Sequence, residues 1–266
     1  MVVEFEGKYE WAVILGASSG LGLATAKKLA KHGLNLCLCY RARKSDLDQI
    51  QKIHSELERN YNIKLITFNM DVTRPEKRNA IIEEIKNKFS KEDRIKTLVH
   101  SIAKGNLKPM ISSSKSTLQN DDFHLTIESM GISLYDWTKQ LFENQLFAED
   151  ARILSFTSEG NSKAWKYYAA VSAAKVVLES ITRSIALEFA PHGIKANCIQ
   201  AGVTDTASLR MIPGSGQLVE ESKKRNPYHR LTKPDDVANV VYLLVKEESS
   251  WINGTTIPVN GGEHLR

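Results

Sequence analysis

Cysteine is scarce in this chain, and long apolar runs are missing. The 266 residues include three cysteines, Cys37, Cys39 and Cys198. Neither their number nor their spacing matches a disulfide framework or a zinc site. Nowhere do about 18 apolar residues follow one another, which is the length that a membrane-spanning helix needs. The first eight residues carry acidic side chains and lack the apolar core of a signal peptide. We therefore expect a soluble, cytoplasmic protein that binds neither a membrane nor a metal ion.

Blocks of like charge, repeats and interdomain linkers are also absent. The chain has 36 basic and 31 acidic residues and a formal charge of +5, with the two signs interspersed. This distribution argues against nucleic-acid binding, which needs a clustered basic surface. A mildly basic surface suits an anionic cofactor or an acidic protein partner, or is simply solvated. We predict one domain over residues 1–266.

A glycine-rich turn follows the first apolar run. Residues 11–15 lack the alternation of a half-exposed strand, which predicts a parallel strand buried on both faces. Glycines then recur with the spacing Gly-x-x-x-Gly-x-Gly before a helical segment. Strand, glycine turn and helix in this order can bind a dinucleotide pyrophosphate, although such a turn can also need glycine for its shape alone. The predicted contacts are Gly16, Ser18, Ser19, Gly20, Leu21 and Gly22.

Basic residues follow the second predicted strand. An acidic residue there would bind the ribose hydroxyls of NAD, whereas arginines accommodate the extra phosphate of NADP. The chain has Arg41 and Arg43 at this place and no acid before Asp46. We predict NADPH as the cofactor, with both arginines around its phosphate; the alternative is an ordinary solvated loop.

A phenol and an ammonium stand seven residues apart in the segment 167–175. On one helix, Tyr168 and Lys175 would lie on the same face and could contact one bound molecule. A neighbouring ammonium would lower the pKa of the phenol. Such a pair also arises by chance in α/β proteins, so its meaning depends on the glycine turn.

Together, the glycine spacing and the Tyr/Lys pair resemble the short-chain dehydrogenase/reductase family. The Tyr-x6-Lys spacing is similar to the branch of bacterial NADPH-dependent enoyl-[acyl-carrier-protein] reductases. Ser101-Ile102-Ala103 also resembles that branch, since most of the family has Asn-Asn-Ala-Gly there. In ordinary members the tyrosine lies four residues before the lysine, where this chain has Val171, and a helical asparagine is present where residues 129–133 have none.

The resemblance implies a fold and further site residues. The implied fold is a doubly wound, Rossmann-like parallel sheet of about seven strands with helices on both faces, assembled as a homo-tetramer or dimer. The implied roles are adenine contacts for Asp71 and Val72, cofactor contacts for Ser101, Ile102 and Ala103, substrate orientation by Ser158, nicotinamide and pyrophosphate contacts for Gly202, Val203, Thr204 and Thr206, and a substrate lid over 207–230.

The pattern of apolar and turn residues predicts where the elements lie. The expected strands are 11–15, 35–40, 63–68, 96–100, 151–158, 194–199 and 254–262. The expected helices are 23–30, 45–60, 75–89, 122–147, 234–245 and one that carries both Tyr168 and Lys175 and ends near residue 190.

The reaction implied by the resemblance is NADPH-dependent reduction of a trans-2-enoyl thioester on acyl carrier protein, in fatty acid biosynthesis. Tyr168 would hydrogen-bond the thioester oxygen, and Lys175 would hold the nicotinamide ribose. One alternative is a 3-oxoacyl or general carbonyl reductase, which Ser158 favours and the missing asparagine opposes. Another is a regulatory protein that binds NADPH without turnover, which the intact Tyr168 and Lys175 pair opposes.

Overall fold

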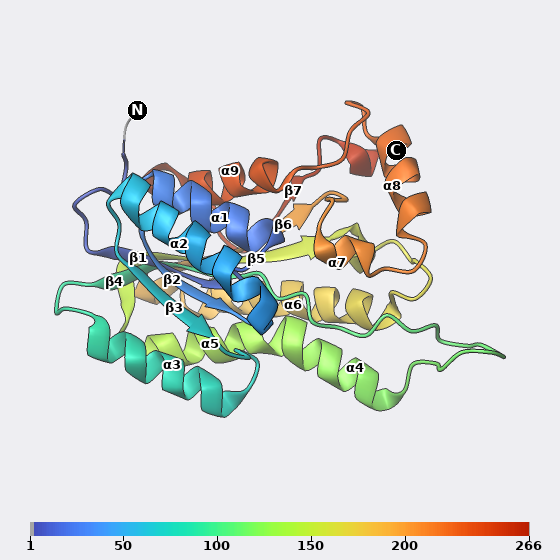
Figure 1. Cartoon of the computed structure of the whole chain (residues 1–266), viewed down its shortest axis with the longest axis horizontal. Coiled ribbons are helices and arrows are strands. Elements are labelled where there is room, and N and C mark those ends of the chain that lie inside the picture. Colours follow the sequence, from blue (N-terminus) through green and yellow to red (C-terminus); the bar gives the residue numbers. More distant parts are fainter. Residues whose placement is uncertain (1–2, 266) are drawn as a thin grey trace.

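The chain folds around one parallel sheet of seven strands (Figure 1). The structure, a computed structural model, describes residues 3–265. The strand order is β3-β2-β1-β4-β5-β6-β7, and every neighbouring pair is parallel. The predicted fold class is confirmed. The strands are β1 Glu10–Leu15, β2 Asn35–Tyr40, β3 Leu65–Asn69, β4 Arg94–His100, β5 Phe147–Ser158, β6 Ile194–Ala201 and β7 Thr256–Val259.

Helices cover both faces of the sheet. In Figure 1, α1, α2 and α9 lie on one side, and α3, α4, α5 and α6 lie on the other. Alternate residues of β1 serve two separate cores: Val13 and Leu15 belong to one, and Ala12 and Ile14 to the other, all 0% exposed. The apolar run without alternation is therefore buried on both faces, as its pattern predicted. The helices are α1 Gly20–Lys31, α2 Leu47–Tyr61, α3 Pro75–Lys88, α4 Asn120–Ile127, α5 Ser133–Glu143, α6 Ala169–Glu188, α7 Ala207–Arg210, α8 Ser215–Arg225 and α9 Pro234–Val245.

The order in which strands are added to the sheet reverses between β1 and β4. From β1 the chain builds outward to β2 and β3, then crosses back to β4 on the other side of β1. Ligands of open α/β sheets bind outside the carboxyl ends of the strands at such a switch point. Residue 16 follows β1 and residue 101 follows β4, so the glycine turn and the predicted Ser-Ile-Ala segment meet at this place.

The predicted helix 122–147 is wrong in its length and regularity. It is divided into α4 and α5 by a π-helical segment, Glu128–Ile132. The hydroxyl of Ser133, the first residue of α5, donates to the carbonyl of Ser129 in this segment at 2.7 Å. The helix ends at Glu143 because Gln145 has a left-handed backbone with φ of 56°, which turns the chain into β5. Strand β5 begins earlier than predicted, at Phe147.

The expectation that one helix carries both Tyr168 and Lys175 is also wrong in detail. Tyr167 has φ of 67°, a left-handed conformation that a right-handed helix excludes, so α6 begins at Ala169. Tyr168 is the N-cap residue of α6, and Lys175 lies two turns inside it.

The described residues were also compared with the requirements of a membrane-spanning helix and of a metal site. No helix within residues 3–265 combines the length and apolar character needed to cross a membrane. Within the same residues, no group of three or more His, Cys, Asp or Glu side chains is arranged to hold a metal ion.

Candidate active site

The glycine turn after β1 is shaped by close backbone approaches. A Cβ atom on Gly16 would lie 2.2 Å from the Ser101 carbonyl oxygen, and one on Gly22 would lie 2.2 Å from the Gly16 oxygen. Gly16 also has φ of 89°. Neither position accepts a side chain. The N-cap residue of α1, Ser19, makes no side-chain cap, so it leaves the N–H groups of the first turn, which includes Leu21, available to an anion.

The turn after β6 reaches the same place. An added Cβ atom on Gly20 would lie 3.4 Å from the Thr206 methyl carbon, although the two residues are far apart in the chain. Thr206 caps α7, accepting a hydrogen bond from the Leu209 N–H at 3.3 Å, and its hydroxyl hydrogen remains free to donate. The structure thus brings the two predicted pyrophosphate contacts together at the start of α1, where Ser18 also lies.

Gly202, Val203 and Thr204 form the first part of that turn. An added Cβ atom on Gly202 would lie 2.4 Å from the Thr232 hydroxyl oxygen, and Thr204 forms a parallel bridge with Thr232. The Thr204 hydroxyl donates to the Gly202 carbonyl at 2.8 Å. These contacts join the predicted nicotinamide contacts to Thr232.

Asp71 is the most strongly perturbed acid near the predicted adenosine site. Its Oδ2 lies 3.0 Å from Lys104 Nζ and 3.4 Å from an Arg41 nitrogen, and Thr73 donates to Oδ1 at 2.6 Å. Burial alone would raise the pKa of Asp71, but the hydrogen bonds from Thr73 and Lys104 outweigh it and lower the pKa to about 2. Asp71 is therefore ionised and already paired with two cations.

Lys104 is a site residue that the sequence reasoning missed. The signal was a basic residue directly after Ser101-Ile102-Ala103. Val72, the other predicted adenine contact, is buried, and its carbonyl accepts a hydrogen bond from the Trp137 indole at 3.0 Å. Arg41 is 68% exposed, and Arg43 is also exposed beside it. Both arginines are thus accessible to a phosphate.

Tyr168 packs beside Ser158 at the carboxyl end of β5. An added Cβ atom on Gly160 would lie 2.4 Å from the edge of the Tyr168 ring, so only glycine lets the ring lie there. Gly160 is a second residue that sequence reasoning missed, and its only signal was its place two residues after Ser158. At the position where ordinary family members have tyrosine, Val171 is buried against Met130 and Ala174.

The pKa of Tyr168 differs from the expectation. Burial raises the pKa of the phenol above its ordinary value, so the phenol stays protonated at neutral pH. The nearby Ser158 hydroxyl offsets part of that rise, although its Oγ is buried and makes no hydrogen bond of regular geometry with any described residue. The expectation that Lys175 lowers this pKa is wrong, because Lys175 Nζ instead donates to the Phe156 carbonyl at 2.6 Å.

Lys175 is buried, with 8% of its surface exposed. Burial lowers the pKa of its ammonium to about 8, against a smaller opposing effect of Cys198 and Glu179. Burial of His100 and, to a smaller extent, the positive charge of Lys175 lower the pKa of His100 to about 3. The His100 imidazole is therefore neutral. His100 hydrogen-bonds the Ser133 hydroxyl at 2.8 Å, beside the π-helical segment where the family's asparagine is missing.

The lowered pKa of Lys175 predicts a pH-dependent stability. The unfolded chain keeps this lysine protonated up to about pH 10.4, whereas the folded chain releases the proton near pH 8. Below pH 8 the buried ammonium therefore lowers the free energy of unfolding by its whole desolvation cost. This loss of stability disappears as the pH rises from about 8 to about 10.4. Compared with Lys175→Met, the wild type should gain stability, by a few kcal/mol at most, from pH 7.5 to 10 in parallel urea titrations. If the difference in free energy of unfolding between the wild type and Lys175→Met stays the same from pH 7.5 to 10, burial does not lower the pKa of Lys175.

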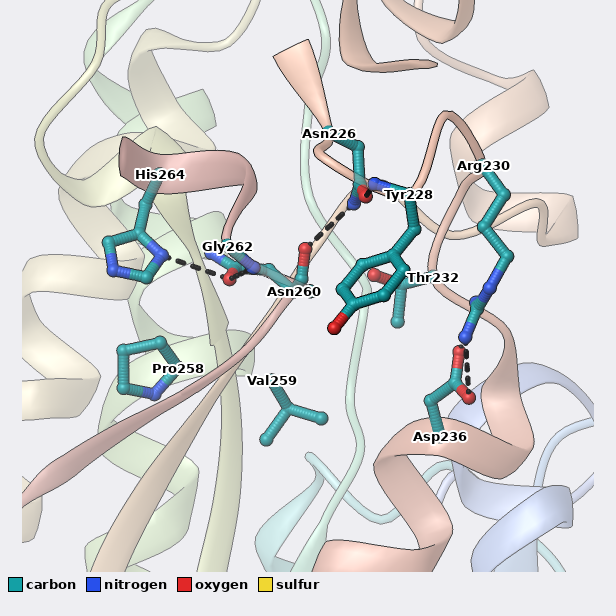
Figure 2. A pocket seen from close by; sticks show the side chains of 11 residues that line it. Asn226, Tyr228, Arg230, Thr232, Asp236, Pro258, Val259, Asn260, Gly262 and His264 are labelled. Atoms are coloured by element: carbon teal, nitrogen blue, oxygen red, sulfur yellow. Dashed lines mark hydrogen bonds and ion pairs between the residues drawn. The ribbon is translucent and has the colours of Figure 1, made fainter. Parts of the chain in front are cut away.

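The predicted lid contains two short helices, α7 and α8, and α8 lies beside the last described turn, Glu263–Leu265 (Figure 1). Beside them, a pocket of about 420 Å³ is bordered by β7 and by the segment after α8 (Figure 2). Its lining includes Tyr228, Arg230 and Asp236, but none of the predicted catalytic or cofactor residues. The candidate active site is therefore the constellation around the glycine turn, Ser158, Tyr168 and Lys175, and not this pocket.

The chain is similar to known oxidoreductases along nearly its whole length. A family model described as "Enoyl-(Acyl carrier protein) reductase" matches residues 16–264. Oxidoreductase UcpA of Escherichia coli (strain K12) is 29% identical over 263 residues, which cover 96% of this chain and 94% of that protein.

Two solved structures show how widely the fold is shared. Enoyl-[acyl-carrier-protein] reductase (NADH) from Aquifex aeolicus VF5 superimposes with a TM-score of 0.83 at 22% identity, covering 98% of each chain. L-Sorbose reductase from Gluconobacter frateurii, complexed with NADPH and L-sorbose, gives a TM-score of 0.82 at 22% identity over 99% of this chain and 98% of that one. At these identities the likeness concerns the fold alone. The family match over residues 16–264 carries the assignment, and the chain belongs to the enoyl-(acyl carrier protein) reductase family within the short-chain dehydrogenase/reductase oxidoreductases.

Proposed function

We propose that the protein reduces the carbon–carbon double bond of a trans-2-enoyl thioester with NADPH, with the acyl group carried on acyl carrier protein during fatty acid biosynthesis. The observation that carries this proposal is the position of Tyr168. Its phenol lies beside the buried Ser158 hydroxyl, and it is seven residues before Lys175. The place of the ordinary catalytic tyrosine is filled by Val171, a core residue.

The cofactor site fits a dinucleotide, since Gly16 and Gly22 leave room only for backbone and the α1 N–H groups are uncapped by side chains. When bound, NADPH supplies a hydride for the β-carbon of the substrate. The glycine turn and Thr206 would hold its pyrophosphate, Lys175 its nicotinamide ribose, and the 202–204 turn its carboxamide. Arg41 and Arg43 would bind the 2′-phosphate.

Negative charge develops on the thioester oxygen as the β-carbon is reduced. Tyr168 would donate a hydrogen bond to that oxygen, where a donor lowers the barrier most. Its raised pKa suits this role, because the phenol remains protonated and able to donate at neutral pH. Ser158, whose buried Oγ lacks a regular hydrogen-bond partner among the described residues, would orient the same carbonyl. The α-carbon is completed by a proton from water, directly or through Tyr168.

A paired assay tests the proposal. Purified protein is offered crotonyl thioester or acetoacetyl thioester, and NADPH absorbance is followed, with NADH as a control. NADPH oxidation with the crotonyl substrate alone is expected. Oxidation with the acetoacetyl substrate alone would favour the carbonyl reductase, the alternative that the free Ser158 hydroxyl supports.

The cofactor preference gives a separate prediction. In the double variant Arg41→Ala/Arg43→Ala, affinity for NADPH should fall about 10- to 100-fold because charge-assisted phosphate contacts are lost. Affinity for NADH should change less than about threefold. Arg74→Ala is the matched control, since Arg74 is similarly exposed at 65% and, like Arg41, pairs with a carboxylate, but it is not assigned to the phosphate. Fluorescence titration with both cofactors measures the ratio, and equal losses for NADPH and NADH would contradict the phosphate assignment.

The proposal also includes assembly into a dimer or tetramer and recognition of an acidic carrier protein. Exposed apolar side chains on α4, α5 and α6, among them Tyr135, Val176 and Leu187, support a dimer or tetramer formed through these helices. On α8, Lys223 and Lys224 are available to an acidic carrier protein, whereas Arg225 points into the molecule.

A further inference from the structure

Arg225, the last residue of α8, contacts two acidic residues from different parts of the chain. One guanidinium nitrogen lies 3.1 Å from Glu159 Oε2, and another lies 2.9 Å from Glu263 Oε1. Glu159 directly follows Ser158, and Glu263 lies in the last turn of the described chain. One cation of the predicted lid therefore joins the Ser158 loop to the C-terminal segment.

Glu263 also contacts the turn after β6. It is 1% exposed, and its Oε2 accepts a hydrogen bond from the Val203 N–H at 3.3 Å. The same oxygen lies 2.9 Å from where a Cβ atom on Gly202 would be, so a larger residue at 202 would displace it. Arg225 is thus linked through one buried carboxylate to the turn that we assign to the nicotinamide.

Glu159 has a second cationic partner that comes from its own loop. Lys163 Nζ lies 3.0 Å from Glu159 Oε2, the oxygen that Arg225 also contacts, and the Lys163 side chain is 48% exposed. Lys163 neutralises the carboxylate without involving α8. It therefore provides a natural comparison for the lid contact.

Few other contacts hold α8 in place. Ser222 is its only buried residue, and Met211 in the preceding turn is 71% exposed. Directly after α8, the Asn226 amide donates to the Asn260 carbonyl at 2.9 Å, as Figure 2 shows. Residues 225 and 226 therefore anchor the C-terminal end of α8.

We infer that Arg225 is a positioning residue that couples the lid to the cofactor turn and to the Ser158 loop. Both ion pairs form only when α8 lies against the two carboxylates at once. We call the lid closed when Arg225 contacts both Glu159 and Glu263. A bound cofactor that orders the 202–204 turn therefore favours the closed lid, because Glu263 contacts both Val203 and Arg225. The closed lid in turn stabilises the loop that carries Ser158, through the ion pair of Arg225 with Glu159. The inference depends on the proposed function only in taking residues 202–204 as a cofactor contact.

Limited chymotrypsin digestion tests the coupling. Mass spectrometry follows cleavage within residues 207–219 with and without NADPH, and NADPH binding is measured separately by fluorescence. In the wild type, saturating NADPH should slow this cleavage about tenfold or more, because it stabilises the closed lid. In Arg225→Met, cleavage should be fast, and NADPH should slow it less than about twofold.

Two further variants separate the coupling from a general loss of structure. Lys163→Met removes the other cation from Glu159 and should keep the wild-type protection by NADPH. Glu159→Gln leaves the pair with buried Glu263 intact, so it should fold even if Arg225→Met does not, and it should lose part of the protection. Arg225→Lys should restore protection only partly, because one ammonium cannot bridge both carboxylates in the same way.

Full protection by NADPH in Arg225→Met, or in Glu159→Gln if the first variant does not fold, would overturn the inference. If Lys163→Met lost as much NADPH protection as Arg225→Met, the inference would also be overturned. Loss of either cation from Glu159 would then have the same effect, whether or not that cation lies on α8. Neither readout needs turnover. A wrong substrate would therefore leave these results unchanged, whereas absence of NADPH binding in the fluorescence titration would reject the proposed function itself.

Discussion

Replacing Tyr168 with phenylalanine is expected to lower kcat for the enoyl thioester about 10²- to 10³-fold, the usual cost of removing one hydrogen-bond donor to a developing oxyanion. The ring stays in its place against Gly160, so only the hydroxyl is lost. Affinity for NADPH should change less than about twofold, because the phenol acts on the substrate oxygen and not on the cofactor. Steady-state kinetics and a fluorescence titration on the same preparation separate the two effects.

The neighbouring phenol provides the control for this experiment. Tyr167 has a left-handed backbone, and its ring lies 5.6 Å from Lys115 Nζ, on the loop that precedes α4. Tyr167→Phe should therefore keep kcat within about threefold of the wild type. If Tyr167→Phe and Tyr168→Phe lose activity equally, or if Tyr168→Phe keeps full activity, Tyr168 is not the donor.

Replacing Lys175 with methionine should abolish activity more completely. This change removes the ammonium but keeps an unbranched side chain of similar length in a buried position. We expect kcat/KM to fall by about 10³ or more and NADPH affinity to fall about tenfold or more, because in the proposed site the lysine would hold the nicotinamide ribose and so position the hydride donor. Loss of both quantities distinguishes it from Tyr168→Phe, in which only kcat should fall.

Stability measurements show whether the Lys175 variant is intact. Removing a buried charge whose pKa is lowered by burial should leave the thermal midpoint unchanged or raise it at pH 7. Lys163→Met, on an exposed lysine of the Ser158 loop, should keep both activity and NADPH affinity. An inactive Lys175→Met protein with a much lower midpoint would mean that the lysine is structural, and normal NADPH affinity would remove it from the cofactor site.

The fold could be predicted in detail because local patterns and burial agree. The apolar run of β1 serves two cores, and the glycines after it are required by contacts of 2.2 Å that no side chain could make. Strand β1 and the glycine turn after it therefore leave clear marks in the sequence. The order of strands and helices along the chain also predicted that Ser158 lies at the carboxyl edge of the sheet, where Tyr168 is found beside it.

Contacts between distant residues could not be predicted in the same way. Nothing local to Asp71 indicates that Lys104 and Arg41 occupy its carboxylate, and nothing in the basic run 223–225 separates Arg225, which points inward, from its neighbours. The start of α6 was misplaced because a left-handed tyrosine is uncommon, and helix periodicity gives no sign of it. The direction of the Tyr168 pKa shift was misjudged because sequence spacing gives distance along a helix, but not burial.

The most direct test of the proposed reaction is where the transferred hydride goes. The protein is given NADPH deuterated at the transferable C4 position together with equal amounts of crotonyl and acetoacetyl thioesters, and the products are analysed by mass spectrometry and NMR. Our account predicts butyryl thioester with one deuterium at C3 and none from the cofactor at C2. 3-Hydroxybutyryl thioester deuterated at the carbinol carbon, with the crotonyl substrate left unchanged, would contradict it.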